Sequence, residues 1–316
     1  MKLRARKNAK CRVVSIVARK GGVGKTFTAI QTAVNAAFGG PEKKKPRLKV
    51  LFVDVDSQQN STYFFLKHFG AVQSFQKVLL PKNPDCEEGQ IYNITDIFMG
   101  NDFIEYPTQY ENLHIIPSDG QIDNFKNEYR DMSEDDLAAS TVVQFKKLIQ
   151  LVEDDYDLIV IDTPPSKTNA CQGAIAASTD CIVVANLDAW NAENALPGIM
   201  SDIEYNNSQF RNMENPINIA GILINKVSSV SMTNDEKKQL RSIKSQWPEH
   251  VHNRFYFVDR VAFKTTEMPQ DPSKFDYMKS KDTAGQMQKF YQHISESILA
   301  DIYDELEAAP KEVVNG

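Results

Sequence analysis

The seven residues from Lys20 to Thr26 constrain this chain more than any other feature. They read Lys-Gly-Gly-Val-Gly-Lys-Thr and lie between a β-branched apolar run, Arg12–Ala18, and a helix-like stretch that reaches Phe38. The glycines leave backbone N–H groups open to phosphate oxygens, Lys25 reaches the terminal phosphates, and the Thr26 hydroxyl binds Mg²⁺. The helix that follows turns its N-terminus toward the same anion. We expect phosphate contacts from Gly21, Gly22, Val23, Gly24, Lys25, Thr26 and Phe27.

Lys20 is a second lysine that an ordinary phosphate-binding loop does not need. A lysine at the start of KGGVGKT resembles the deviant Walker A motif of the ParA/MinD family. The resemblance implies an α/β fold of the P-loop NTPase type, with a mostly parallel twisted sheet and helices on both faces. It also implies ATP and Mg²⁺ as cofactors, and a homodimer in which Lys20 reaches the partner's nucleotide. Lys20, Lys25 and Asp56 are then the catalytic residues.

Two acidic strand ends follow the loop. The apolar run Lys49–Val55 ends in Asp54-Val55-Asp56-Ser57-Gln58, which resembles the family's acidic pair followed by Pro-Gln. The resemblance implies that Asp56, in switch I, positions the attacking water, and that Asp54 lies deeper near Mg²⁺. Ser57 stands where the family has proline. Because proline would fix φ, the serine predicts a looser switch I.

A third apolar run, Asp157–Ile161, is followed by Asp162-Thr163-Pro164-Pro165. This segment resembles the family's Walker B and switch II. Asp162 is therefore the expected Mg²⁺ partner, through water, because Mg²⁺ keeps part of its hydration shell. Each aspartate alone would be equally consistent with a carboxylate that caps a loop after a strand. Three of them in the expected order favour a nucleotide site.

The hydrophobic pattern predicts strands alternating with helices, and hence a parallel sheet covered on both faces. The expected strands are Arg12–Ala18, Lys49–Val55, Asn112–Pro117, Asp157–Ile161, Asp180–Asn186, Ile217–Asn225 and Arg254–Val258. The expected helices are Gly24–Phe38, Glu134–Glu153, Thr168–Ser178, Asn191–Asn206, Asp235–Gln246 and one from about Ala284 to Leu306. One ATPase domain over 12–308 is predicted, with an irregular insertion at about 80–110, a basic extension at 1–11 and a flexible tail at 309–316.

Composition favours a cytoplasmic enzyme. The four cysteines form no CxxC pair, which argues against a zinc site, an iron–sulfur scaffold or a secreted disulfide framework. No run approaches the roughly 20 apolar residues of a membrane-spanning helix. MinD-like proteins end in a basic amphipathic helix, whereas this chain ends in an acidic segment around Asp304–Glu307, which anionic lipid would repel. Membrane anchoring is therefore not expected.

Recognition of the base is predicted less directly. The run Gly221–Lys226 resembles the family strand whose terminal asparagine bonds the purine, so Asn225 is the candidate. An asparagine that merely ends a strand in a turn is the alternative. Lys264–Pro269 resembles a family segment near the adenine, but the Ile-Pro that usually precedes it is missing.

The resemblance to short ParA proteins implies partition of plasmid or chromosomal DNA. An ATP-bound dimer would bind nonspecific duplex DNA at the nucleoid, and a ParB-like or other small centromere-binding partner would stimulate hydrolysis. With a net charge of −6, DNA binding requires a local cluster of cations. Lys237, Arg241 and Lys244 recur at helical spacing, and Lys264 aligns with a DNA-contacting arginine of relatives. A solvated basic face is the alternative.

Two other functions are consistent with the same motifs. One is a ParA-like ATPase that positions a protein cargo, such as a chemoreceptor array or a carboxysome. The other is a nonenzymatic scaffold gated by nucleotide. The presence of Asp56 argues against the scaffold, because a pure switch needs no carboxylate to position water.

Overall fold

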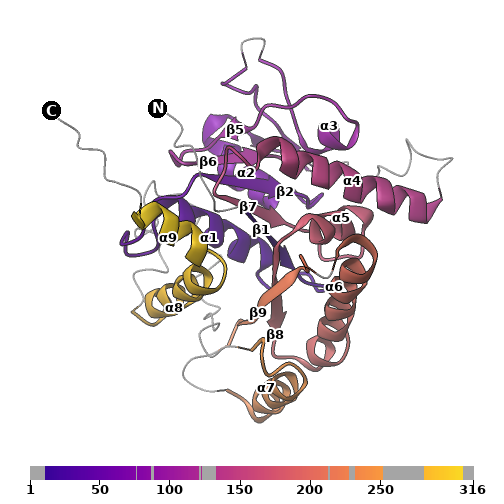
Figure 1. The fold of residues 1–316 in the computed structure, drawn as a ribbon, viewed down its shortest axis with the longest axis vertical. Helices are drawn as coiled ribbons and strands as arrows, with labels where there is room; N and C mark the ends of the chain where they lie inside the picture. Colours follow the sequence, from indigo (N-terminus) through magenta and orange to yellow (C-terminus); the bar gives the residue numbers. More distant parts are fainter. Residues whose placement is uncertain are drawn as a thin grey trace.

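A seven-stranded sheet forms the centre of the chain (Figure 1). The computed structural model describes residues 11–75, 77–86, 89–120, 122, 133–212, 214–227, 232–251 and 281–308. The strands of the sheet are β1 (Arg12–Val17), β2 (Val50–Asp54), β5 (Tyr106–Pro107), β6 (Leu113–Ile116), β7 (Leu158–Asp162), β8 (Asp180–Asn186) and β9 (Asn218–Asn225). Their order is β5-β6-β2-β7-β1-β8-β9. Neighbours run parallel except β5, which pairs antiparallel with β6 at the edge. The predicted fold class is confirmed.

Helices cover both faces of this sheet, because its parallel strands are apolar on both sides (Figure 1). One face carries α1 (Lys25–Phe38), α2 (Asn60–Leu66), α8 (Lys281–Ser297) and α9 (Ala300–Ala308). The other carries α3 (Ile94–Phe98), α4 (Glu134–Val152), α5 (Asn169–Ala177), α6 (Leu196–Phe210) and α7 (Asn234–Gln246). Alternate residues of β1 serve the two faces: Val14 and Ile16 pack toward α1, and Val13 packs toward α4 and α5.

The predicted elements within the described residues form near their expected bounds, with two corrections. The helix expected over Asn191–Asn206 begins as a π-helical turn, η3 (Asn191–Ala195), and then continues as α6 to Phe210. Pro197 lies at the start of α6. It cannot donate a backbone hydrogen bond, which favours a widened turn at this point. The strand predicted at Arg254–Val258 lies outside the described residues.

The single helix expected from Ala284 to Leu306 is wrong. The chain leaves α8 at Ser297 and re-enters a helix, α9, at Ala300. Leu299 N–H donates to Ile294 C=O, five residues back, which closes the turn between the two helices. Ile298 and Leu299 are both buried in the core beside α1, so the bend is the conformation that packs both side chains.

The segment predicted as an irregular insertion contributes an edge strand as well as a short helix. β5 pairs with β6, and α3 begins with a capping box formed by Asn93 and Asp96. Before this segment, α2 leads through a short 3₁₀ turn, η1 (Lys67–Phe69), to a hairpin of β3 (Val72–Gln73) and β4 (Val78–Leu79). This hairpin is separated from the predicted switch I by α2 and η1. The division into one domain with an extension and a tail stays a prediction.

Candidate nucleotide site

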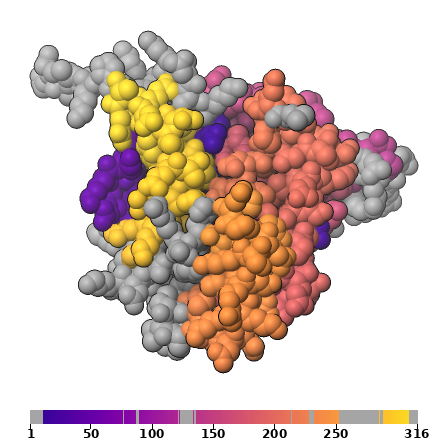
Figure 2. Space-filling model, turned by 60° about the horizontal axis from the view of Figure 1, so that its bottom comes forward, coloured from indigo at the N-terminus to yellow at the C-terminus, as the bar shows by residue number. Residues whose placement is uncertain are grey.

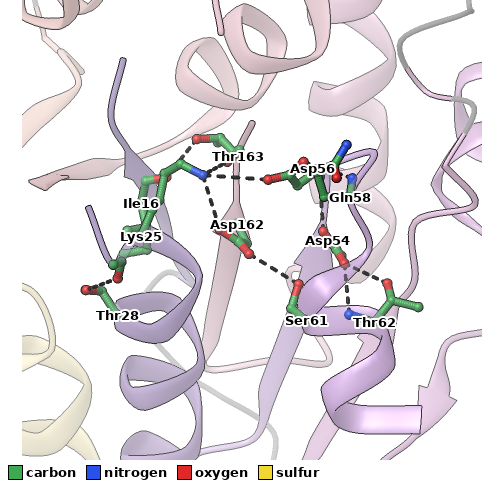
Figure 3. Close-up of polar contacts among 11 residues, drawn as sticks. Ile16, Lys25, Thr28, Asp54, Asp56, Gln58, Ser61, Thr62, Asp162 and Thr163 are labelled. Carbon is green, nitrogen blue, oxygen red and sulfur yellow. Dashed lines mark hydrogen bonds and ion pairs between the residues drawn. The ribbon is translucent and has the colours of Figure 1, made fainter. Parts of the chain in front are cut away.

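The three predicted site segments leave neighbouring strands at one edge of the sheet. β7 lies between β2 and β1, and Asp162 is the register partner of both Asp54 in β2 and Ile16 in β1. The carboxyl ends of parallel strands are where α/β folds bind ligands. The order of strands therefore brings together the loop after β1, the acidic pair at the end of β2 and Asp162, which lies more than a hundred residues further along the chain (Figure 3).

The glycine loop is held open by left-handed backbone. Gly22 and Gly24 have φ values of 73° and 97°, which suit glycine because it has no Cβ. A Cβ on Gly24 would lie 2.0 Å from Asn225 Nδ2, whereas one on Gly21 or Gly22 would meet nothing within 4 Å. Tight packing thus fixes the end of the loop, and its middle borders open space, as a bound phosphate requires.

Asn225 supports the loop from β9. Its side-chain amide donates to Val23 C=O at 2.7 Å, and its Oδ1 accepts from Lys226 N–H at 2.9 Å. Its predicted contact with a purine stays a prediction, while its structural contact is with the loop. Phe27 lies in the core, so only its backbone N–H, in the first turn of α1, is placed to meet an anion.

Lys25 is the centre of the site. Its side chain is only 7% exposed, and Nζ donates to Thr163 C=O. Nζ also lies 3.9 Å from Asp56 Oδ2 and 3.9 Å from Asp162 Oδ1 (Figure 3). The lysine expected to reach phosphate therefore lies against switch I and switch II at once. A buried cation of this kind is held only where carboxylates compensate its lost hydration.

The deeper carboxylates are costly to ionise. Burial raises the pKa of Asp162 from 3.8 to about 7, with Lys25 acting in the opposite direction. Burial likewise raises the pKa of Asp54 to about 6, against the lowering effect of hydrogen bonds from Thr62 and Asp56. Asp54 Oδ2 accepts from Thr62 N–H and Oγ1 at 2.9 and 2.7 Å, which braces β2 against α2. Its predicted place near a metal stays a prediction.

Asp56 is presented by a compact turn. Its N–H donates to Asp54 Oδ1 at 3.0 Å, and its own Oδ1 accepts from Gln58 N–H at 3.0 Å. The remaining oxygen, Oδ2, faces Lys25. Ser57, at the family's proline position, does not prevent this turn from forming.

The residues fit a hydrated Mg²⁺ ion beside a phosphate. Asp162 Oδ1 is buried and makes no hydrogen bond to any described residue, and Lys25 Nζ faces it at 3.9 Å. The Thr26 hydroxyl lowers the pKa of the same carboxyl group, a smaller effect than that of burial. Threonine and aspartate oxygens together match the preference of Mg²⁺ for oxygen ligands and retained water. Within the described part of the chain, no cluster of three or more His, Cys, Asp or Glu side chains offers a separate metal site.

Lys20 lies outside this buried cluster. Its Nζ pairs with Asp188 Oδ2 at 2.7 Å and lies 5.9 Å from the centre of the Trp190 ring. Although burial acts the other way, the hydrogen bonds from Lys20 and Asn191 hold the pKa of Asp188 below its ordinary value. Both side chains of the ion pair are more than a third exposed. Such a pair is worth about 0.2–1 kcal/mol, so Lys20 is available to exchange it for another anion.

Of the predicted DNA-binding residues, three lie on α7. Lys237 and Arg241 are exposed and one helical turn apart, and Lys244 is half-buried. Ile243 anchors the opposite side of the helix in the core. Lys264 lies outside the described residues.

Sequence reasoning missed several polar groups that build the site. Ser61 Oγ donates to Asp162 Oδ2 at 3.2 Å, and Thr163 Oγ1 donates to Ile16 C=O at 2.7 Å. The Gln59 side chain hydrogen-bonds Val78 and Ser118, which links the Asp56 turn to two neighbouring segments. The available signal was the polar cluster Asn60-Ser61-Thr62 directly after the acidic strand end, typical of a helix start.

Comparisons with known proteins agree with this geometry. Residues 11–216, well over half of the chain, match the family model AAA_31, an AAA domain. The sporulation initiation inhibitor protein Soj of Bacillus subtilis is 26% identical over 182 residues, or 58% of this chain and 61% of that protein. A virulence plasmid ParA family protein, pGP5-D, of Chlamydia psittaci is 31% identical over 165 residues, 52% of each chain.

The chain belongs to the AAA domain family of this model, and its sequence relatives identify it as a member of the ParA/MinD type. The match spans only about half to two thirds of the length of these curated relatives. Solved structures show the same fold over more of the chain. Apo McdA of Cyanothece has a TM-score of 0.67 at 18% identity and covers 90% of this chain and 99% of its own. A putative plasmid partition protein of Borrelia burgdorferi bound to AMPPNP has a TM-score of 0.64 at 21% identity, covering 92% and 100%.

No helix in the described part of this ParA/MinD-family chain is both long enough and apolar enough to cross a membrane.

The raised pKa of Asp162 predicts a stability effect. A carboxyl group that binds its proton more tightly when folded makes the free energy of unfolding decrease as pH rises, here from about 4 to about 7. Asp162→Asn keeps the shape without the charge. In nucleotide-free protein with chelator, we expect the variant to exceed wild type at pH 8 by at least about 1 kcal/mol, since one pKa unit is worth about 1.4 kcal/mol. The gap should shrink at pH 5.

Chemical denaturation at both pH values measures this. Asp202→Asn is the matched control, because Asp202 is buried but contacts Arg19 at 2.6 Å and Lys167 at 3.5 Å. Loss of that carboxylate should destabilise the protein at both pH values. An Asp162→Asn protein less stable than wild type at pH 8 would contradict the account of the buried cluster.

Proposed function

We propose that this chain is a Mg²⁺-dependent ATPase of the ParA type, which dimerises on ATP, binds nonspecific DNA and drives partition of plasmid or chromosomal DNA. The observation that carries the proposal is the contact of Lys25 with Asp56 and Asp162 at the end of an open glycine loop. Lys25 lies close to a carboxylate from each switch segment. A nucleotide that attracts Lys25 would therefore change the electrostatic surroundings of both Asp56 and Asp162.

The phosphate site is built from the loop and from α1. Backbone N–H groups from Gly21 to Phe27 would surround the phosphates, and Lys25 would exchange Thr163 C=O for a phosphate oxygen. Thr26 directly, and Asp162 through water, would hold Mg²⁺, which neutralises phosphate charge when bound. The Borrelia burgdorferi structure with AMPPNP supports binding of a nucleoside triphosphate by this fold.

Hydrolysis needs a water molecule placed for in-line attack on the terminal phosphate. Asp56 Oδ2 is the free oxygen of a carboxylate whose other oxygen is fixed by Gln58 N–H. It would orient this water and accept its proton. Lys25, and Lys20 from the partner subunit, would stabilise the charge on the phosphoryl group, the main contribution to phosphoryl-transfer catalysis.

Dimerisation depends on Lys20. The weak, half-exposed pairing with Asp188 keeps the ammonium group at the surface beside Trp190. Two chains whose phosphates face each other repel, and a lysine reaching across neutralises that charge. Lys20 would therefore leave Asp188 as the ATP dimer closes.

The proposed DNA surface is α7, coloured orange in Figure 2, which stands out from the face shown there. Lys237, Arg241 and Lys244 share one side of the helix because they are spaced by four and three residues. Lys264 is proposed to join them. Because the whole chain has a net charge of −6, binding would be local to this surface and sensitive to salt.

The chain would act at the nucleoid in the cytoplasm. A ParB-like or other small centromere-binding protein is the proposed partner that stimulates hydrolysis. A ParA-like ATPase that positions a protein cargo is the second candidate function. It is favoured by the likeness of the fold to McdA, because a curated relative of that kind, at 22% identity over 198 residues, is named for carboxysome distribution.

Substitution of the two loop lysines is expected to affect different properties, ATP binding for Lys25 and dimerisation for Lys20. Lys25→Ala should abolish ATP binding, because it removes the buried cation that meets the phosphates. Lys20→Ala should bind ATP with near wild-type affinity and remain monomeric. Equilibrium nucleotide titration and light scattering separate the two effects. Asp188→Asn is the control, since it keeps Lys20 and should still dimerise. Wild-type dimerisation of Lys20→Ala would refute the cross-subunit role.

Removal of the switch I carboxylate should stop turnover but not assembly. Asp56→Ala is expected to bind ATP, dimerise and stay on DNA, with a turnover rate lowered by about 10²–10⁴, as in other losses of a general base. Asp102→Ala removes an exposed loop carboxylate and should turn over normally. Steady-state phosphate release with DNA and partner measures both. An Asp56→Ala rate equal to wild type would exclude the assignment.

Charge reversal on α7 tests the DNA surface. Arg241→Glu or Lys237→Glu should remove ATP-dependent binding to duplex DNA of any sequence but leave dimerisation intact. In wild type, binding should weaken with salt, and each lost phosphate contact should lower the log–log slope by roughly 0.9. Lys44→Glu makes the same charge change at a lysine after α1 that is 76% exposed, and should bind DNA more strongly than either α7 variant.

The outcome also separates the two candidate functions. A wild-type chain that dimerises with ATP yet has no affinity for duplex DNA at low salt would contradict partition. It would favour a positioning ATPase that uses another matrix.

A further inference from the structure

Gln59 has an unusual backbone conformation directly beside switch I. Its φ is 55°, in the left-handed region, at the N-cap of α2. Long side chains rarely adopt this conformation, which suits glycine or asparagine. Among the described residues, only Lys43 and Lys226 are other non-glycine residues with positive φ. Backbone held in such a conformation is often found at functional sites.

The side chain of Gln59 is completely buried and uses both ends of its amide. Oε1 accepts from Val78 N–H at 2.8 Å, in β4 of the hairpin. Nε2 donates to Ser118 C=O at 2.7 Å, in the loop after β6, and to Val78 C=O at 3.3 Å. A buried amide satisfied in this way fixes the relative positions of the segments that it joins.

The backbone of Gln59 connects this brace to the catalytic turn. Its N–H donates to Asp56 C=O at 2.9 Å, closing the turn that starts at Asp56, and its C=O accepts from Tyr63 N–H at 2.9 Å, in α2. The loop after β6 is attached a second time, since Ser118 N–H donates to Thr62 Oγ1 at 2.9 Å. The Asp56 turn is therefore held between α2, the hairpin and the 118–120 loop.

The Gln59 amide packs closely against the 118–120 loop. A Cβ on Gly120, whose φ is 77°, would lie 2.9 Å from Gln59 Oε1. The loop thus passes so close to the glutamine amide that only glycine is accommodated there without a shift. Ser57, which cannot rigidify the turn as proline would, precedes this brace by two residues. Through its side chain, Gln59 links the turn to Val78 and Ser118 and so adds stiffness that Ser57 does not provide.

We propose that Gln59 is a positioning residue for ATP hydrolysis, which holds Asp56 at the attacking water by bracing switch I against Val78 and Ser118. The inference rests on the proposed ATPase function and extends it. Gln59 contacts neither Lys25 nor the glycine loop in the hydrogen bonds described above, so nucleotide binding should not depend on it. Its loss should affect the turnover rate alone, because displacement of a catalytic group by about 1 Å can cost about a hundredfold in rate.

Two substitutions remove the brace while suiting the backbone. Gln59→Gly relieves the positive φ and is accepted at an N-cap, and Gln59→Asn keeps an amide that tolerates positive φ but is one methylene too short. Both should retain the wild-type affinity for ATP, the wild-type KM and ATP-dependent dimerisation. We expect kcat to fall by about tenfold to a hundredfold. Lys43→Gly is the matched control, because it relieves the same strain, at φ 56°, on an exposed turn. It should leave kcat unchanged.

The outcomes are distinct. A kcat within twofold of wild type in both Gln59 variants would overturn the proposal. So would loss of ATP binding in both, because Gln59 would then be needed for folding of the site rather than for the position of Asp56. Failure of the ATPase function itself gives another pattern, in which wild type and Asp56→Ala are equally inactive with Mg²⁺, DNA and partner. Wild-type hydrolysis that Asp56→Ala abolishes and Gln59→Gly retains in full contradicts only the role of Gln59.

Discussion

The contacts of buried Lys25 are the interaction on which the site depends. One ammonium group bonds Thr163 C=O and faces Asp56 and Asp162, each at 3.9 Å. Its charge partly offsets the burial that raises the pKa of Asp162. Under the proposed function, a cation shared by Asp56 and Asp162 would connect a bound phosphate to both switch segments. Any anion that competes for Lys25 must change the balance of charge at both carboxylates.

The order of strands makes this contact possible. Because β7 lies between β2 and β1, Asp54, Asp162 and the start of the glycine loop leave the sheet side by side. Helix α1 on one face and α5 on the other fix the strands, so the site is built on rigid elements. Two parts of the site lie beyond the strands: half-exposed Lys20, weakly paired with Asp188, and the buried Asp56 turn, which Gln59 braces.

The sequence predicted the secondary structure well where an apolar pattern extends over a whole strand or helix. Apolar runs predicted the six strands β1, β2, β6, β7, β8 and β9, and the aspartates after β2 and β7 were found because strand ends are easy to locate. Two-residue strands such as β3, β4 and β5 have no period to detect. The bend at Ile298 has no glycine or proline to mark it. The brace made by Gln59 depends on Val78 and Ser118, which are distant in sequence, so only the fold could reveal it.

The central claim is that ATP, through Lys25 and Lys20, changes the chain from a monomer to a dimer. Its most direct test is the molar mass of the wild-type protein, measured by light scattering with Mg²⁺ and either AMPPNP or ADP. The account predicts twice the mass of one chain with AMPPNP and the mass of one chain with ADP. Equal masses with the two nucleotides, both shown to be bound, would contradict it.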